Sequence, residues 1–398
     1  MSDIEYEVCI IGGLGHVGLP LGIAFASKRK NVVLYDINEE ATTLVRKGVI
    51  PFMEEGAETA LAGVINQTLY VSTDPSVISK AKYIIITIGT PVDEHLNPNL
   101  KQFTNCIADL KPYLRDGQHV VLRSTIYPGI TEKARDMLLE SGRKLSVSFC
   151  PERIAEGKAL KELAELPQIV SGFDRDSLRE ARELFQSITE DVIELEPLEA
   201  ELAKLYTNTW RYLQFAISNY FYQLSTQNNV DFYKIFHAIK HKYPRAQNFP
   251  APGFAAGPCL FKDTMQLASY SNSNFFMGHA AMLVNEGLPN FIVQRLKERG
   301  GLKNKTVGIL GMAFKANNDD KRESLAYKLR KLFTLEARRV LCSDAYIEEQ
   351  GFISAQEVVA AADIVVLATP HAEYAQLTIA PEKHLVDVWN FFGKGGLF

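Results

Sequence analysis

The sequence predicts an α/β protein with two doubly wound parallel-sheet domains joined by a central helical segment. Three observations support this fold class. Short apolar runs alternate with helix-compatible segments over residues 7–172, a stretch without glycine or proline covers residues 198–227, and a second alternation begins at residue 306. Such alternation is typical of parallel sheets covered by helices on both faces. The 398 residues suffice for two or three domains, at a soft prior of about 150 residues each.

The first domain is expected at residues 1–196. Its opening apolar run at residues 7–12 is followed by GGLGHVGLP, a helix-compatible stretch at 21–30 and a second apolar run at 31–36. This order is that of a βαβ unit. Further strand-like runs occupy residues 83–89, 119–125, 145–149 and 167–172.

The second domain is expected at residues 197–298 and is helical. Aromatic and aliphatic residues surround its stretch at 198–227. A helix that is apolar on more than one face is buried on more than one side. We therefore expect a homodimer interface along this helix, with an internal core helix as the alternative.

The third domain, expected at residues 299–398, repeats the plan of the first. Its strand-like runs lie at residues 306–311, 339–346, 363–370 and 384–390. The two sheet domains share no short fixed period, so they are expected to be similar folds and not solenoid repeats.

Composition excludes several classes of function. Lys plus Arg number 43 against 47 Asp plus Glu, a net charge of -4, which leaves no basic excess for a nucleic-acid partner. No apolar run approaches the ~20 residues that cross a bilayer, and the first residues lack the features of a signal peptide, so we expect a cytoplasmic protein without a membrane partner. The five cysteines are scattered and never in CxxC spacing, which predicts neither a disulfide framework nor a metal site.

The segment Gly13-Leu14-Gly15-His16-Val17-Gly18 matches GxGxxG between an expected strand and an expected helix. There the backbone N–H groups and the helix N-terminus can hold a pyrophosphate, which is the Rossmann arrangement. Gly13 would permit the turn, Gly15 the approach of the diphosphate and Gly18 the packing of helix on strand. Asp36 ends the second strand, where its carboxylate would accept hydrogen bonds from a ribose diol and repel a 2′-phosphate. The prediction is NAD in preference to NADP, with a purely structural turn as the alternative.

Cys259 lies in PGFAAGPCLFKD, where small residues and prolines suggest a shaped loop. Lys262 and Asp263 follow closely, and a nearby ammonium favours the thiolate. On these residues alone, a buried structural cysteine remains the alternative.

Seven separated segments resemble, in the same order, those of the UDP-glucose/GDP-mannose dehydrogenase family: GGLGHVGLP, IGTPVD, RSTIYPG, PERIAEG, AELAKLYTN, GPCLFKD and GMAFKANNDDKRES. The resemblance implies NAD-dependent oxidation of the C6 hydroxymethyl of a nucleotide sugar to a carboxylate. It also implies two Rossmann-like domains joined by a dimerising helical segment, which agrees with the division above.

The resemblance assigns Cys259 as the nucleophile that holds the C6 aldehyde as a thiohemiacetal and then as a thioester. Glu152 matches the general base for thioester hydrolysis, and Glu156 a second acid that contacts the cofactor. Cys150 lies two residues before Glu152 but lacks the GPCLFKD setting, so we interpret it as a core thiol at a strand end.

Lys204 and Asn208 are four residues apart and project from one face of a helix. The resemblance implies that Lys204 stabilises oxyanions and that Asn208 orients substrate or water. Asp263 matches an aspartate of the water network, and Thr125 a hydroxyl beside the nicotinamide and C6.

The full sets implied by the motif and the resemblance are as follows. The expected cofactor contacts are Gly13, Gly15, His16, Val17, Gly18, Asp36, Thr90, Thr125, Glu156, Lys262 and Arg322. The expected substrate contacts are Glu152, Lys204, Asn208, Gly257, Phe314 and Lys315.

Some positions depart from the family pattern. The segment before Cys259 reads FAAGPC where many relatives carry GFGGPC, so Ala255 and Ala256 stand at places often occupied by more permissive or differently shaped residues. Asn318 stands where threonine is common, and Ala41 replaces an often basic residue near the adenosine. These changes affect the cofactor and substrate contacts more than the catalytic set.

The substrate prediction is UDP-glucose, because CLFKD resembles that branch; the alternative is a UDP-N-acetylhexosamine, because NTWRY resembles enzymes of that branch. Two rivals remain, one of another class and one a further enzyme. A catalytically silent nucleotide-sugar-binding protein would reduce no NAD, and a simple hydroxyacid dehydrogenase would need no cysteine and would reduce about one NAD per substrate.

Overall fold

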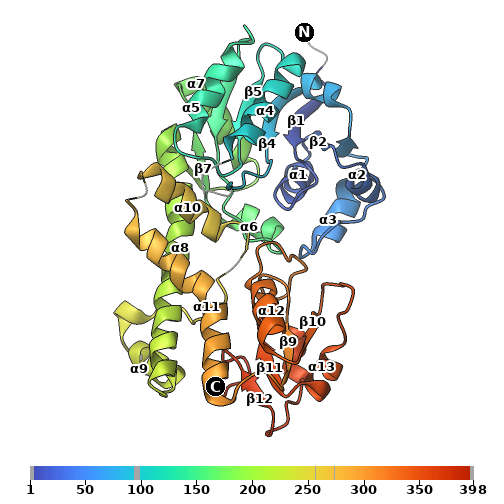
Figure 1. Cartoon of the computed structure of the whole chain (residues 1–398). Coiled ribbons are helices and arrows are strands. Elements are labelled where there is room, and N and C mark those ends of the chain that lie inside the picture. Colours follow the sequence, from blue (N-terminus) through green and yellow to red (C-terminus); the bar gives the residue numbers. More distant parts are fainter. Residues whose placement is uncertain (1–3, 94–98, 256, 273, 395–398) are drawn as a thin grey trace. The chain divides into compact units, whose positions relative to one another are not determined.

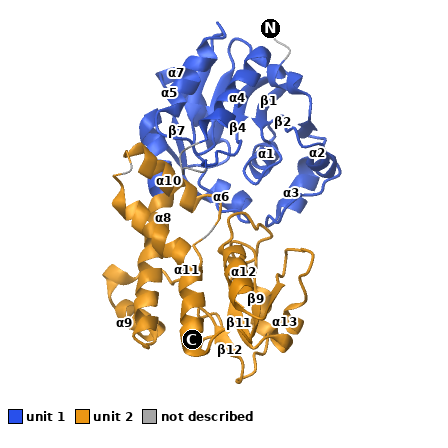
Figure 2. Cartoon of the chain, viewed as in Figure 1, with its two compact units in different colours: residues 1–207 blue, residues 208–398 orange. Residues whose placement is uncertain are grey.

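The computed structural model describes residues 4–93, 99–255, 257–272 and 274–394, so Ala256 lies outside the described residues. The chain forms two compact units, residues 1–207 (unit 1) and 208–398 (unit 2), shown in Figure 2. The division falls inside one long helix, α8 (Pro197–Gln227).

Unit 1 is built on a six-stranded parallel sheet of order β3-β2-β1-β4-β5-β6 (Figure 1). The strands are β1 (Tyr6–Ile11), β2 (Val32–Tyr35), β3 (Leu69–Ser72), β4 (Ala81–Ile86), β5 (His119–Leu122) and β6 (Ser146–Phe149). This is the strand order of a dinucleotide-binding fold. The doubly wound α/β prediction is confirmed for this unit.

Alternate residues of β1 enter two separate cores. Val8 and Ile10 pack with α1 (Gly18–Ser27), whereas Cys9 and Ile11 pack with α4 (Leu100–Leu110) and α5 (Ile130–Leu139). Successive strand side chains point to opposite faces, so helices cover both faces of the sheet. The remaining helices of this unit are α2 (Glu39–Arg46), α3 (Ala57–Val64), α6 (Ala159–Glu165), α7 (Arg175–Gln186) and the short η1 (Pro75–Lys80) and η2 (Lys111–Tyr113).

A separate pair of parallel strands, β7 (Gln168–Ser171) and β8 (Val192–Leu195), completes unit 1. The sequence predicted β7 but not β8 or β3. Both missed strands are four residues long and mostly half-buried or exposed, so they lack the continuous apolar run that marks a buried strand.

Unit 2 combines helices with a four-stranded parallel sheet of order β10-β9-β11-β12. Its strands are β9 (Thr306–Leu310), β10 (Arg339–Ser343), β11 (Ile364–Leu367) and β12 (His384–Val386). Its helices are the second part of α8, α9 (Phe232–Lys240), α10 (Leu260–Tyr270), α11 (Phe276–Gly300), α12 (Leu325–Glu336), α13 (Ala355–Ala361) and the short η3 (Pro244–Ala246) and η4 (Ala372–Gln376).

The sheet of unit 2 is also covered on two faces. Val307 and Ile309 pack with residues of α9, α11 and α12, while Leu310 and Val365 pack with Val358 of α13. The second Rossmann-like domain that the sequence predicts is therefore present, and it is preceded by a helical region.

Candidate active site

The glycine-rich loop connects β1 to α1 at the carboxyl end of the sheet. A Cβ on Gly18 would lie 2.5 Å from the Gly12 carbonyl oxygen, so only glycine lets α1 start this close to the strand. Gly15 is exposed, and a Cβ there would meet only the Gly12 oxygen at 3.6 Å. This leaves open space in front of a helix N-terminus, which suits a phosphate group.

The left-handed backbone of this turn belongs to Gly12, at φ +72°, and not to Gly13. Gly13 instead makes a close contact, since a Cβ there would lie 2.8 Å from Cβ of Leu34 in β2. The sequence analysis gave Gly13 the role of permitting the turn; in the structure Gly12 takes the positive φ, and Gly13 makes the close contact with β2.

Asp36 directly follows β2. One carboxylate oxygen accepts the Leu14 N–H at 3.1 Å and the other accepts the Asn38 N–H at 3.0 Å. These bonds fix the acid beside the glycine-rich loop. In the same loop, the His16 ring stacks on Phe52 with centroids 4.1 Å apart, and Val17 is the N-cap residue of α1.

Thr90 and Thr125 follow the neighbouring strands β4 and β5. The Thr90 hydroxyl donates to the carbonyl oxygen of Thr125. Because the carboxyl ends of parallel strands meet at one edge of a sheet, the two threonines share the edge that carries the glycine-rich loop.

Glu152 follows β6 at the same edge and is 7 % exposed. Its Oε2 accepts two N–H groups of Arg123, at 2.9 and 2.6 Å, and its Oε1 accepts the backbone N–H groups of Arg153 and Ile154, at 2.7 and 3.0 Å. Four donors match the four lone-pair directions of a carboxylate, so the Glu152 side chain is held in one orientation.

Arg123 is a residue that the sequence analysis missed. It is 1 % exposed, and besides Glu152 it donates to the Cys150 carbonyl at 3.0 Å and to the Gln168 side chain at 2.9 Å. Its guanidinium also lies 4.7 Å from the centroid of the Phe185 ring. The available signal was a cation at the end of the apolar run HVVLR, because a buried cation needs a partner.

Glu156 lies four residues after Glu152 in a loop that Glu54 holds. The Glu54 carboxylate accepts the backbone N–H groups of Gly157 and Ala159, at 2.8 and 2.6 Å. Glu156 itself is half-buried.

Lys204 and Asn208 lie one turn apart on α8, and both are buried. The Lys204 ammonium makes no ion pair or hydrogen bond with any residue that the structure describes. A buried cation without a partner is costly unless a ligand supplies one, so this side chain is suited to meet an oxyanion.

In unit 2, Asn208 contacts Asp263, which lies in the first turn of α10. The Asn208 amide donates to Asp263 Oδ2 at 2.6 Å, and Lys262 Nζ lies 2.9 Å from Asp263 Oδ1. Asp263 is fully buried. Three residues that the sequence singled out therefore meet at one helix end.

Cys259 is the N-cap residue of α10, and its carbonyl oxygen accepts the Asp263 N–H at 2.9 Å. Cys259 is exposed to solvent. The N-terminal end of a helix favours a negative group, so the position suits a reactive thiolate.

Cys150 offers the opposite setting. It is fully buried at the end of β6, and burial raises the pKa of its thiol to about 12. The interpretation of Cys150 as a core thiol agrees with this position.

The segment after β9 carries Phe314 and Lys315. Phe314 packs on Gly257, where a Cβ would come within 2.6 Å of its ring. Its backbone N–H donates to the Asp320 carbonyl at 2.9 Å. The Arg322 guanidinium pairs with the Asp320 carboxylate, with Nε 2.8 Å from Oδ2. Two expected substrate contacts, Gly257 and Phe314, are thus neighbours.

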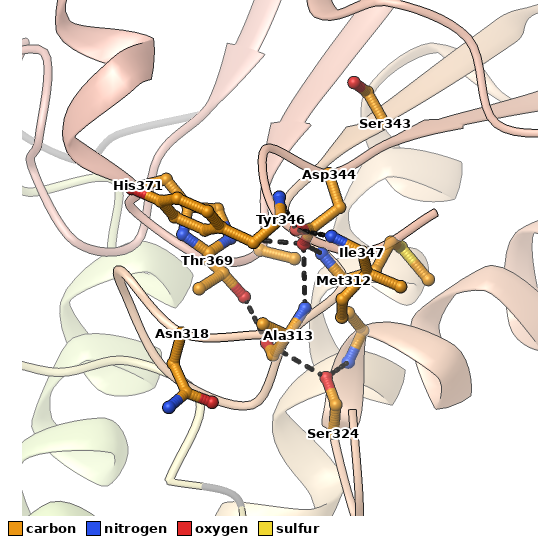
Figure 3. Close-up of polar contacts among 12 residues, drawn as sticks. Met312, Ala313, Asn318, Ser324, Ser343, Asp344, Tyr346, Ile347, Thr369 and His371 are labelled. Carbon is orange, nitrogen blue, oxygen red and sulfur yellow. Dashed lines mark hydrogen bonds and ion pairs between the residues drawn. The ribbon is translucent and has the colours of Figure 1, made fainter. Parts of the chain in front are cut away.

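A buried pair, Asp344 and His371, contacts this segment (Figure 3). His371 Nε2 lies 3.1 Å from the Asp344 carboxylate, and His371 Nδ1 accepts the Asn317 N–H at 3.0 Å. Figure 3 shows the same carboxylate facing the backbone of the residues after β9 and β10. It accepts the N–H groups of Met312, Ala313, Tyr346 and Ile347.

None of the helices that the structure describes has the length and apolar character needed to cross a membrane.

Three family models match the chain. The NAD binding domain of the UDP-glucose/GDP-mannose dehydrogenase family matches residues 6–189, its central domain residues 198–286, and its UDP binding domain residues 308–394.

Individual proteins match over nearly the whole chain. The UDP-N-acetyl-D-mannosamine dehydrogenase of Methanocaldococcus jannaschii is 31% identical, over 94% of this chain and 87% of that protein. The solved structure of a UDP-D-ManNAc dehydrogenase from Pyrococcus horikoshii has a TM-score of 0.90 at 28% identity, covering 97% of this chain and 96% of that one. A UDP-glucose dehydrogenase from Pyrobaculum islandicum has a TM-score of 0.88 at 26% identity, covering 96% and 94%.

These matches confirm the resemblance seen in the sequence, the fold class and the use of NAD, and the UDP binding domain supports a nucleotide-sugar ligand. The chain belongs to the UDP-glucose/GDP-mannose dehydrogenase family and is an NAD-dependent nucleotide-sugar dehydrogenase.

Proposed function

We propose that the enzyme oxidises the C6 hydroxymethyl of a UDP-N-acetylhexosamine, with UDP-N-acetyl-D-mannosamine as the first candidate, to the carboxylate. The observation that carries this substrate is the similarity over 94% of the chain to a UDP-N-acetyl-D-mannosamine dehydrogenase. The NTWRY sequence of the central helix supports the same choice. The preference for UDP-glucose drawn from CLFKD is not confirmed, and the N-acetylhexosamine alternative is the better supported one.

The proposed chemistry is a four-electron oxidation through Cys259. When bound, NAD would supply the acceptor for the hydride that leaves C6 in each of two oxidations. Between them the Cys259 thiolate attacks the C6 aldehyde and forms a thiohemiacetal, and the second oxidation leaves a thioester. Water then cleaves the carbon–sulfur bond, which releases the carboxylate and returns the thiolate. The exposed position of Cys259 at the start of α10 supports this role.

We assign the oxyanion contact to Lys204, because its buried ammonium makes no ion pair among the described residues and would gain a partner in the transition state. Thr125 is assigned to a hydroxyl contact at C6. Asn208 and Asp263, joined at 2.6 Å, are assigned to orientation of the substrate and the hydrolytic water.

Glu152 is assigned to activation of that water. Since its oxygens already hold four protein donors, the water must share Oε1 or replace one of the backbone N–H groups. Replacement of a backbone N–H group would require the loop after Glu152 to move when the ligand binds, whereas sharing of Oε1 would not.

The binding sets expected from the sequence are kept as proposals. For NAD they are Gly13, Gly15, His16, Val17, Gly18, Asp36, Thr90, Thr125, Glu156, Lys262 and Arg322. The open space at Gly15 and the carboxylate of Asp36 fit a diphosphate and a ribose diol. For the nucleotide sugar they are Glu152, Lys204, Asn208, Gly257, Phe314 and Lys315. Division into three domains at residues 196 and 298 remains part of this proposal.

A homodimer through α8 is part of the proposal as well. An apolar stripe on this helix faces solvent in the single chain, with Trp210 60 %, Ile217 46 % and Tyr220 50 % exposed, and Phe221 and Leu224 continue it. The spacing follows one face of a helix. Exposed apolar stripes of this kind mark protein interfaces.

The deciding experiment incubates the purified protein and NAD with UDP-N-acetylmannosamine, other UDP-N-acetylhexosamines and UDP-glucose, and measures NADH and product mass. We expect about two NADH per sugar and the acid as product, with the highest kcat/KM for the N-acetylhexosamine. About one NADH per substrate would indicate a simple dehydrogenase, and binding without NADH a silent binding protein. A higher kcat/KM for UDP-glucose would restore the first substrate prediction.

A further inference from the structure

The loop that precedes Cys259, residues 250–258 and here called the cysteine loop, is not part of a helix or strand over its described residues. Its conformation decides where the thiol lies. Such a loop has no ladder of backbone hydrogen bonds, so its buried backbone groups need side-chain partners.

Asn219, on α8, supplies these partners. Its Oδ1 accepts the Gly253 N–H at 2.8 Å, and its Nδ2 donates to the Gly253 carbonyl at 2.9 Å. The side-chain amide thus satisfies both backbone groups of one loop residue, as a neighbouring strand would. Asn219 is fully buried, so water cannot replace it.

A second asparagine orients the first. Nδ2 of Asn219 also donates to Oδ1 of Asn285 on α11 at 2.8 Å, and Nδ2 of Asn285 donates to the Tyr212 carbonyl at 3.1 Å. Asn285 is fully buried too. Both amide hydrogens of Asn219 are therefore used, and the ring of contacts allows only one orientation of its amide.

The loop has little freedom to find another position. A Cβ on Gly253 would lie 2.1 Å from the Trp389 ring, so the backbone already packs against that side chain. Ser218, beside Asn219, donates to the Pro250 carbonyl at 2.5 Å. Anchors at Pro250 and Gly253 fix the loop nine and six residues before Cys259.

We propose that Asn219, oriented by Asn285, is a positioning residue for the nucleophile: it holds the cysteine loop so that the Cys259 thiolate can reach C6. The inference rests on the proposed function of Cys259. Neither asparagine touches the reacting atoms. A displacement of a reacting group by about 1 Å can cost about 100-fold in rate, so loss of this anchor should lower kcat and leave cofactor binding unchanged.

The test compares wild type with Asn219→Leu, which keeps the number of side-chain heavy atoms and removes every hydrogen bond of the amide. We expect kcat to fall at least 30-fold, while KM for NAD stays within about twofold because the proposed NAD contacts are largely in unit 1. Hydrogen exchange at the Gly253 amide should rise at least tenfold, with no change in peptides of β9.

Two further variants keep the result interpretable. Thr226→Val is the matched control, since it removes a buried hydroxyl of the same helix that donates to Tyr222 within that helix at 2.9 Å; its kcat should stay near wild type. Ser218→Ala removes one loop anchor, and its kcat should fall about threefold. If Asn219→Leu does not fold, comparison of the kcat of Ser218→Ala with that of Thr226→Val decides whether the loop anchor positions the thiol.

The outcomes separate this inference from the function it rests on. Suppose that the wild type oxidises the nucleotide sugar. The positioning role of Asn219 is then wrong if the kcat of Asn219→Leu stays within threefold of the wild-type value, or if it falls no further than the kcat of Thr226→Val. If the wild type reduces no NAD with any nucleotide sugar, the proposed function is wrong. Hydrogen exchange at the Gly253 amide then tests only whether Asn219 anchors the loop, and an unchanged exchange rate in Asn219→Leu overturns that.

Discussion

The Asn208 side-chain amide donates to the Asp263 carboxylate at 2.6 Å, across 55 residues of sequence. This bond ties α8 to the first turn of α10, immediately after Cys259. It places the expected nucleophile at the end of a helix that is fixed by a buried charged hydrogen bond.

Reversing this bond tests it. Asn208→Asp places two carboxylates in the contact and should lower the free energy of unfolding by about 3 kcal/mol, because a buried charge loses its donor. Asn208→Asp with Asp263→Asn restores one donor and one acceptor and should recover most of that loss. Urea unfolding followed by fluorescence measures this, since both tryptophans, Trp210 and Trp389, lie in unit 2. A double variant no more stable than Asn208→Asp would contradict the pairing.

Cys259→Ser should abolish acid formation, whereas Cys150→Ser should retain it. The buried Cys150 thiol, with its pKa raised to about 12, stays protonated at neutral pH. Product mass and the number of NADH formed per sugar measure the difference. An equal loss of acid formation in the two variants would contradict the assignment of Cys259 as the nucleophile.

Arg123→Met should destabilise unit 1 by about 3–5 kcal/mol, since it leaves the Glu152 carboxylate buried without its cation. The double change Arg123→Met and Glu152→Gln removes the charge as well and should recover more than half of the loss. Urea unfolding followed by circular dichroism gives the free energies. Equal stability of the single and the double variant would mean that the ion pair is not what holds this edge of the sheet.

Gly18→Ala should weaken NAD binding at least tenfold, because the new Cβ would lie 2.5 Å from the Gly12 oxygen and push the loop away from α1. Gly63→Ala is the matched control: its Cβ would meet nothing within 4 Å on helix α3, and helical alanine is favoured over glycine by about 0.5–1 kcal/mol. Calorimetric titration with NAD compares the two. The idea fails if both variants bind NAD as wild type does.

Asp344 predicts a pH dependence of stability. Burial raises the pKa of this carboxyl, but the bonds from His371 and from the backbone of Tyr346 and Met312 outweigh burial and hold it below its ordinary 3.8. A lowered folded-state pKa stabilises the fold above the ordinary value, and the contribution is lost as pH falls through the folded value.

Wild type should therefore be more stable than Asp344→Asn by about 1.5–3 kcal/mol at neutral pH, and the difference should shrink on acidification below pH ~4. Urea unfolding at a series of pH values measures it. If the difference in the free energy of unfolding between the two proteins grows toward acid pH, the folded-state pKa of Asp344 is raised and not lowered.

Much of the fold follows from local sequence patterns. The runs at residues 7–12, 31–36 and 306–311 became β1, β2 and β9, and the stretch without glycine or proline became α8. Periodicity and turn residues act over a few positions, so one sequence can reveal them. The four-residue strands β3 and β8 were not predicted, because pairing with neighbouring strands determines their extended conformation more than their own residues do.

The sequence by itself determined the fold class, the glycine-rich turn before α1, the acid after β2 and the set of chemically capable residues, because each depends on nearby residues or on a motif. Tertiary structure alone decided that Gly12 takes the positive φ, that Arg123 saturates Glu152, and that Asn219 holds Gly253. These contacts join residues brought together by the path of the whole chain, and their stability comes from burial, which no local pattern encodes.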